Sequence, residues 1–276
     1  MSPEGAKVAT VFDLDAYLAR IGLEGRPSIG DVHRAHLTSI PFENLDPHCG
    51  IPVSLALPDL ERKLVAEGRG GYCFEQNLLL KAALEALGAE VDLVLARVRL
   101  GGPPGVARPR THLVLRVTVD GLSWLADVGF GHGSLLEPVP FGAGGEYLQL
   151  GRRLRVVDEE PELVLQVAEG DAWLDLYGFV PEPVPFVDLE TSNWFTSTYP
   201  RSPFVTGLIV CAHAEDGSQT TLSDWDGLAL KEETPGGTSV TPVAREDVPE
   251  LLAHRFGLSG YTMSAEGRLV PPALIA

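Results

Sequence analysis

The sequence predicts an α+β protein in three parts: a helical first third, a central run of strands that forms a small barrel or curved sheet, and a final segment that mixes strands with a helix. Before residue 90, apolar residues recur at helical spacing. After residue 90, short β-branched runs alternate with Gly, Pro and Asp clusters. We expect the parts to span 1–90, 91–200 and 201–276, with a linking helix near 187–195.

Helix signals mark the first third. Ser28 is a typical N-cap, Pro58 a typical first-turn residue, and Gly88 a typical stop. The helices that we expect there span 13–21, 28–37, 58–66 and 73–88.

Strand signals mark the middle of the chain, and the last segment mixes both types. A Gly- and Pro-rich loop at 101–105 and a proline-dense stretch at 181–185 interrupt the pattern. The expected strands span 91–100, 111–119, 122–128, 147–157, 162–166 and 172–177, with two more near 204–211 and 239–243. A final helix over 245–256 is expected to end at Gly257.

Cys73 comes shortly after two glycines, in the run 69–77 that stands directly before the apolar, helix-forming stretch 78–87. Unpaired backbone N–H groups and the helix dipole at a helix start stabilise a thiolate, which is the form of sulfur that attacks carbonyls. A buried packing role is the alternative for a free cysteine. The position of Cys73 favours a nucleophile.

His112 and Asp127 are predicted to lie near each other on a β-hairpin. The dipeptide Asp120-Gly121 favours a two-residue turn between the strands 113–119 and 122–128. In that register His112 faces Gly129, which leaves room for the imidazole ring, and Asp127 is a diagonal neighbour roughly 7–8 Å away. Cys, His and Asp in this order therefore suggest covalent acyl transfer at a core similar to that of cysteine proteases.

Composition limits the function classes. The chain has 276 residues, is 45% hydrophobic and carries a formal charge of −17, which argues against broad nucleic-acid binding. We find no signal peptide pattern and no apolar run long enough to span a membrane, so we expect a cytoplasmic protein without a membrane partner. Three cysteines are too few for a disulfide framework, and a reducing compartment suits an active thiol.

The segment 93–119 is locally basic and contains no acidic residue. It either receives a phosphorylated cofactor or coats the solvent faces of strands, and the pattern leaves both open. Its arginines are Arg97, Arg99, Arg108, Arg110 and Arg116.

Other histidines and cysteines invite a metal interpretation, but their spacing fits no familiar site, so we expect no metal. Surface or interdomain positions explain the histidines of the first third, a loop position explains His132, and packing explains the remaining two thiols. These residues are His33, His36, His48, Cys49 and Cys211.

Four landmarks and a weaker fifth resemble the arylamine N-acetyltransferase family, particularly its bacterial members. They are Ile-Pro-Phe-Glu-Asn-Leu at 40–45, Arg-Gly-Gly-Tyr-Cys-Phe-Glu at 69–75, Thr-His-Leu at 111–113, Asp-Val-Gly-Phe-Gly at 127–131, and the stretch 197–204. The string around Cys73 is the specific one, and the fifth departs from many relatives because Tyr199 stands where they have histidine.

The resemblance implies a helical domain with the cysteine, a β-barrel domain with the histidine and aspartate, and an α/β third domain that acts as a lid. It implies that acetyl-CoA, a co-substrate and not a tightly bound cofactor, acylates Cys73, that His112 activates the thiol and that Asp127 orients the imidazole. An aromatic amine or hydrazine then takes the acetyl group in a ping-pong sequence.

The resemblance also implies binding roles. Phe42, Phe130 and Phe204 are expected to line the acceptor pocket. Thr111, Gly129 and Gly131 are expected to border the coenzyme A channel. Glu43 and Arg69 match the buried ion pair that braces the cysteine loop in the family.

Alternatives with the same three residue types remain open. One is an amide synthase of the same family that closes macrolactam rings from a carrier protein, a second is a thiol hydrolase, and a third is a binding module with a relict triad. The sequence also leaves open the preferred acyl donor (acetyl, propionyl, malonyl or carrier-bound), the physiological amine and the oligomeric state.

Overall fold

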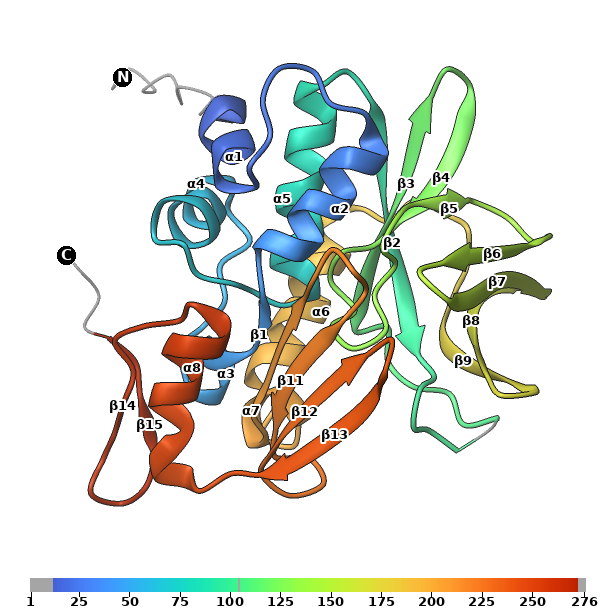
Figure 1. Cartoon of the computed structure of the whole chain (residues 1–276). Helices are drawn as coiled ribbons and strands as arrows, with labels where there is room; N and C mark the ends of the chain where they lie inside the picture. Colours follow the sequence, from blue (N-terminus) through green and yellow to red (C-terminus); the bar gives the residue numbers. More distant parts are fainter. Residues whose placement is uncertain (1–11, 104, 273–276) are drawn as a thin grey trace, which may run out of the picture.

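The computed structural model describes residues 12–103 and 105–272 and confirms the α+β class. Helices of the first third gather on one side, a strongly curved antiparallel sheet forms a near-closed barrel on the other, and a second sheet with a C-terminal helix lies below both (Figure 1). Three buried apolar clusters fill these regions: one under the helices, one inside the barrel and one beneath the second sheet.

The helical part follows the expected pattern closely. Ser28 accepts a hydrogen bond from the Asp31 N–H, and the Asp31 carboxylate accepts one from the Ser28 N–H, so both ends of a capping box are present. The helix expected from Pro58 is a short α-helix that continues as a π-helical turn over Glu61–Ala66. The helices are α1 (Leu14–Arg20), α2 (Ile29–Ser39), α3 (Leu45–His48), α4 (Leu57–Leu60) and α5 (Cys73–Ala86).

The barrel has eight antiparallel strands in the order β5-β4-β3-β2-β9-β8-β7-β6. The predicted hairpin register is confirmed, because Val119 pairs with Leu122 and Leu115 with Ala126. Asp120 and Gly121 both have positive φ, 51° and 77°, as a tight hairpin turn requires. The strands are β2 (Glu90–Val98), β3 (His112–Val119), β4 (Leu122–Ala126), β5 (Val139–Pro140), β6 (Glu146–Gln149), β7 (Arg152–Glu159), β8 (Glu162–Glu169) and β9 (Ala172–Phe179).

The second sheet joins a short strand of the helical part to strands of the last third of the chain. Its first strand, β1 (Phe42–Glu43), comes from the helical part, and Phe42 pairs with Cys211 of β10 while also bridging to Gly71 in the loop before Cys73. The cysteine loop is therefore attached to the C-terminal sheet. The remaining elements are α6 (Phe186–Thr198), α7 (Pro203–Thr206), β10 (Ile209–His213), β11 (Gln219–Ser223), β12 (Ala229–Thr234), β13 (Gly237–Pro242), α8 (Val248–Phe256), β14 (Thr262–Met263) and β15 (Leu269–Val270).

Two strand predictions were wrong, and some strands were missed. The stretch 147–157 is two strands, β6 and β7, because the chain turns at Leu150 and Gly151, whose φ values are 45° and 82°. Residues 203–206 form the helical turn α7, so the strand expected from 204 begins only at Ile209. The pattern did not predict β11 and β12, which build the centre of the second sheet.

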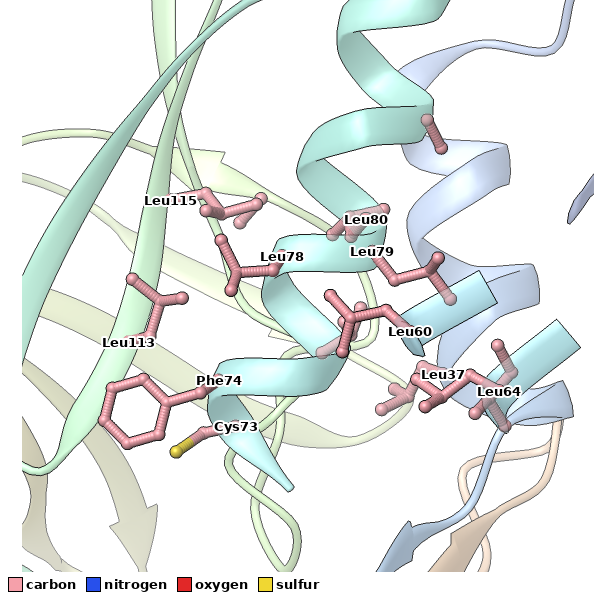
Figure 2. Close-up of a cluster of buried hydrophobic side chains, with 14 of the residues drawn as sticks. Leu37, Leu60, Leu64, Cys73, Phe74, Leu78, Leu79, Leu80, Leu113 and Leu115 are labelled. Atoms are coloured by element: carbon pink, nitrogen blue, oxygen red, sulfur yellow. The ribbon is translucent and has the colours of Figure 1, made fainter. Parts of the chain in front are cut away.

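Helix α5 is the element that places the cysteine. It packs against β3 on one side and against α2 and α4 on the other. Figure 2 shows Leu78 on the side facing Leu113 and Leu115 of β3, and Leu79 toward Leu37 of α2, with Cys73 at the first turn. Because α5 is buried nearly all round, its N-terminus is held in a fixed position against the barrel. No helix in the described ranges is both long and apolar enough to cross a membrane.

Candidate active site

Cys73 begins α5, as predicted, and is only 3% exposed. The Glu75 carboxylate accepts a hydrogen bond of 3.1 Å from the Tyr72 N–H and so fixes the chain at the entry to the helix. The two glycines before it are required by close packing. A Cβ on Gly70 would lie 2.1 Å from the Pro41 carbonyl oxygen, and one on Gly71 would lie 2.8 Å from the Glu75 carboxylate.

The structure brings Cys73, His112 and Asp127 together. His112 opens β3, Asp127 follows directly after β4, and the His112 Nε2 lies 2.7 Å from the Asp127 Oδ2. The Cys73 thiol lies near enough to the imidazole to raise the pKa of His112, and it donates a hydrogen bond of 3.6 Å to the Thr111 carbonyl oxygen. The three side chains are therefore buried together, with the imidazole bound to the carboxylate.

Electrostatics favour the charged form of His112. Burial alone would lower its pKa, but the Asp127 charge and the hydrogen bonds to Asp127 and Cys73 outweigh it and raise the pKa of His112 to about 10. Burial likewise works against an ionised Asp127, yet the His112 charge and hydrogen bonds from His112, Asn77 and the Gly129 N–H hold the pKa of Asp127 below its usual value. The pair is thus an imidazolium and a carboxylate at neutral pH.

Asn77 is a site residue that the sequence analysis missed. Its Nδ2 donates to the Asp127 Oδ1 at 2.9 Å and to the Leu113 carbonyl at 2.7 Å, while its Oδ1 accepts from the Val128 N–H at 3.1 Å. The signal was present, because residues four apart on a helix share a face and Asn77 is four residues after Cys73.

The reason expected for a glycine at position 129, room for the His112 ring, was wrong. The glycine does not make room for the imidazole; it makes room for the start of α5. A Cβ there would lie 2.6 Å from the Cys73 Cα and 2.8 Å from the Asn77 Nδ2. The loop after Asp127 thus contacts the Cys73 backbone directly.

A buried cluster of charges supports the cysteine loop. The predicted ion pair is present, with 2.7 Å between Arg69 and Glu43. Arg69 also pairs with Asp46 at 2.7 Å, and Lys63 pairs with Asp46 at 2.7 Å and with Glu75 at 2.6 Å. Burial raises the pKa of Glu75 to about 7 despite the Lys63 charge, because Glu43 and Asp46 add like charge.

Of the surface or interdomain positions expected for His33 and His36, the surface one was wrong for both. His33 contacts Asp127 and Leu136 of the barrel part, as an interdomain residue would, whereas His36 contacts Tyr17 and Gln76 inside the helical part. Both are fully buried. Burial lowers the pKa of His33 to about 4 and that of His36 to about 3, which keeps both rings neutral.

Aromatic side chains gather around the residues next to Cys73 and around His112. The rings of Phe42 and Phe204 are 6.3 Å apart, Phe204 is 5.7 Å from Tyr72, and Phe130 packs edge-on against His112 at 5.2 Å. The three phenylalanines named from the sequence therefore come from three distant segments to one region. The Tyr72 hydroxyl donates to Asn193 of α6, which ties this region to the linking helix.

Of the three residues expected at the coenzyme A channel, Thr111 and Gly129 contact Cys73, whereas Gly131 contacts His213 and Phe42. Thr111 presents its carbonyl to the thiol. Gly131 has a φ of 73°, accepts a hydrogen bond from His213 at 3.0 Å and lies against the Phe42 ring. Gly129 is buried against α5.

The arginines of 93–119 are mostly engaged by acidic side chains from other strands. Arg99 lies 2.6–3.0 Å from Glu159, Glu162 and Asp175, and Arg116 lies 2.6 Å from Asp92. Arg97 also pairs with Glu162, at 3.3 Å. A cavity of about 630 Å³ opens beside them, but no triad residue lines it. These contacts favour the interpretation that the arginines coat strands.

The other two thiols differ from Cys73 in their surroundings. Cys211 is fully buried in β10 and Cys49 is half-buried beside the β14–β15 hairpin. Burial raises the pKa of both to about 11, so both stay protonated at neutral pH.

Comparisons with known proteins agree with this geometry. A family model described as N-acetyltransferase matches residues 27–261. The arylamine N-acetyltransferase of Mycolicibacterium smegmatis is 44% identical over 258 residues, which cover 89% of this chain and 92% of that protein. The solved structure of the Mycobacterium marinum arylamine N-acetyltransferase superimposes with a TM-score of 0.84 at 38% identity, covering 89% of this chain and 92% of that one. The same M. marinum enzyme in complex with CoA gives a TM-score of 0.83 at 37% identity, with the same coverage.

Proposed function

Because this chain belongs to the arylamine N-acetyltransferase family and is an enzyme of that kind, we propose that it moves an acetyl group from acetyl-CoA to an aromatic amine or hydrazine through a thioester on Cys73. The observation that carries the proposal is the buried His112–Asp127 pair, 2.7 Å between Nε2 and Oδ2, with the equally buried Cys73 thiol near enough to raise the pKa of His112. An imidazolium in this position stabilises a thiolate.

In the first half-reaction the Cys73 sulfur attacks the thioester carbonyl of acetyl-CoA. The carbon–sulfur bond to coenzyme A breaks, and the departing thiolate takes a proton from His112. Backbone N–H groups at the first turn of α5 would stabilise the oxyanion of the tetrahedral intermediate. The products are acetyl-Cys73 and coenzyme A.

In the second half-reaction the amine nitrogen attacks the acetyl carbonyl of acetyl-Cys73. The bond to the Cys73 sulfur breaks, the amine proton passes to His112, and the amide leaves. Asp127 holds the imidazole in one orientation through both halves and stabilises its charge.

Recognition of the two substrates follows from the surroundings of the triad. We assign Phe42, Phe130 and Phe204 to the flat, apolar acceptor, since aromatic rings are recognised by aromatic edges and faces. We assign Thr111, Gly129 and Gly131 to the border of the coenzyme A channel. Gly129 contributes main-chain atoms only, because α5 fills the space where its side chain would be.

The proposal extends to organisation and location. We propose three domains, at 1–90, 91–200 and 201–276, with β1 counted with the third because it pairs with β10. A cytoplasmic location fits a catalytic thiol, which a reducing compartment preserves.

The test is acetylation without an acceptor. Incubation with acetyl-CoA should add one acetyl group to the peptide that contains Cys73, as mass spectrometry of a digest can show. Cys73→Ser should abolish the adduct, while the matched variant Cys49→Ser should keep it, because that thiol lies beside the β14–β15 hairpin.

The isolated acetyl-enzyme should then transfer its acetyl group to an added arylamine faster than to water. An adduct on another cysteine, or no adduct on folded protein, would refute the thioester. Hydrolysis with no acetylated amine would replace the transferase assignment with a thiol hydrolase.

A further inference from the structure

One face of α2 carries two buried histidines whose ring nitrogens are all engaged. The His33 Nε2 accepts a hydrogen bond from the Asp127 N–H at 3.1 Å, and its Nδ1–H donates to the Leu136 carbonyl oxygen at 3.2 Å. His33 is therefore the Nδ1–H tautomer. It joins the helical part to both ends of the loop that follows the catalytic carboxylate.

His36, one turn later, is the opposite tautomer. Its Nδ1 accepts from the Tyr17 hydroxyl at 2.8 Å, and its Nε2–H donates to the Gln76 Oε1 at 2.6 Å. The Gln76 Nε2 in turn donates to the carbonyl of Gly71 at 3.2 Å, in the loop before Cys73. The same helix face thus reaches both the carboxylate loop and the cysteine loop.

The hydrogen bond between His33 and Asp127 lies just beyond the point where strand pairing supplies hydrogen-bond acceptors for the backbone. The β3–β4 ladder ends at the pair Leu115 and Ala126, so Asp127 is the first residue beyond it. Its N–H is buried with the rest of the residue, and a buried N–H without an acceptor is unfavourable by about 1–3 kcal/mol. The imidazole supplies the missing acceptor.

We propose that His33 is a positioning residue of the reaction: by accepting the Asp127 N–H it fixes the main chain from which the carboxylate reaches His112. The proposal rests on the triad role given to Asp127 above. Two other groups hold the same carboxylate, Asn77 by its amide and Gly129 by its N–H. His33 is the contact that fixes the N-terminal side of this residue, and without it Asp127 can rotate away from the imidazole.

Protonation would destroy the contact, because a second ring proton would oppose the Asp127 N–H. The charged or titratable groups that face His33 are Asp127 and His36, and its other polar neighbour is the Leu136 carbonyl. Burial keeps the ring neutral, so the contact persists across the range in which the enzyme would work.

Three substitutions separate positioning from packing. His33→Leu fills the space but offers no acceptor. His33→Asn places an amide where Nδ1 stands and reaches only the Leu136 side, whereas His33→Gln extends an oxygen to the position of Nε2 and can accept the Asp127 N–H. The matched control is Val32→Ala, which loosens the packing of the same helix at a fully buried position without touching Asp127.

The readout is the rate constant for acetylation of Cys73 in a single turnover, together with the KM for acetyl-CoA. We expect His33→Leu and His33→Asn to lower the rate constant about 10- to 100-fold with little change in KM, because a displacement of about 1 Å has this effect on a reacting geometry. His33→Gln should recover most of the rate, and Val32→Ala should keep it despite a lower Tm. Equal rates in all three His33 variants, or a loss in Val32→Ala that follows Tm, would overturn the proposal.

Two measurements are independent of acetyl transfer and remain informative if the proposed function fails. The rate of Cys73 alkylation by iodoacetamide at pH 6, relative to pH 9, should fall in His33→Leu and stay unchanged in Val32→Ala. In the unmodified protein, ¹⁵N shifts of labelled histidine should show His33 as the Nδ1–H tautomer with no titration between pH 5 and 9. An Nε2–H tautomer would overturn the proposal even if no variant folds.

Discussion

Replacing Gly129 by alanine should damage the site through its shape alone. The added Cβ would lie 2.6 Å from the Cys73 Cα and 3.1 Å from the Cys73 carbonyl oxygen. The first of these is about 0.8 Å inside ordinary van der Waals contact, and both neighbours are backbone atoms that cannot rotate away. The start of α5 and the loop after Asp127 must therefore move apart by most of that distance.

The magnitude follows from two effects. Overpacking of this kind lowers the free energy of unfolding by about 1–3 kcal/mol, which corresponds to a fall in Tm of several degrees for a chain of this size. The sulfur moves with the backbone, so single-turnover acetylation of Cys73 should slow by about 10- to 100-fold. The loss of rate should exceed what the loss of folded protein explains.

The assay pairs thermal unfolding with stopped-flow acetylation by acetyl-CoA. Gly142→Ala is the matched control, since a Cβ there meets nothing within 4 Å and its φ is not positive. The control should keep both Tm and rate. If Gly129→Ala also keeps the Tm and the acetylation rate, the start of α5 and the loop after Asp127 do not approach this closely, and the prediction is refuted.

Asp127→Asn keeps the shape of the side chain but cannot stabilise the imidazolium, so the rate of single-turnover acetylation should fall by about 10⁴-fold. A loss below tenfold in stopped-flow measurements would contradict the triad. Glu75→Gln tests the buried charge cluster. The folded-state pKa of Glu75, about 7, lies above its ordinary value of 4.5, so the folded chain keeps a proton that the unfolded chain has released, and the stability of the native protein falls as pH rises from 4.5 to 7. This group contributes a decline of about 3 kcal/mol that Glu75→Gln should lack in urea unfolding at pH 5 and pH 8, and equal declines would refute it. Tyr72→Phe leaves the buried Asn193 side-chain oxygen without its donor and should lower the free energy of unfolding by about 1–3 kcal/mol, whereas an unchanged urea midpoint would show that the hydroxyl contributes nothing.

Local signals predicted those parts of the site whose conformation depends on residues close by in the sequence. The turn at Asp120-Gly121 determined the register of the hairpin, and that register brings His112 close to Asp127. The start of α5 could be placed because helix signals lie within a few residues of Cys73.

Contacts between distant segments could not be predicted in this way. The partners of His33 lie 94 and 103 residues away, and an isolated histidine in a helix gives no sign that a backbone N–H will be buried against it. The acidic partners of Arg99 likewise come from 60 or more residues later. The turn at Leu150 and Gly151 gave only a weak signal, the single glycine, because leucine rarely adopts a positive φ.

The pairing of β1 with β10 affects how this protein is made. Asn44 accepts the Ile209 N–H across a separation of 165 residues, so a chain emerging from the ribosome contains Cys73 long before the strand that pairs with β1 exists. Non-local closure of this kind is slow compared with helix formation. The thiol therefore acquires its full surroundings only after β10, which follows the whole barrel in the chain, has been synthesised and docked.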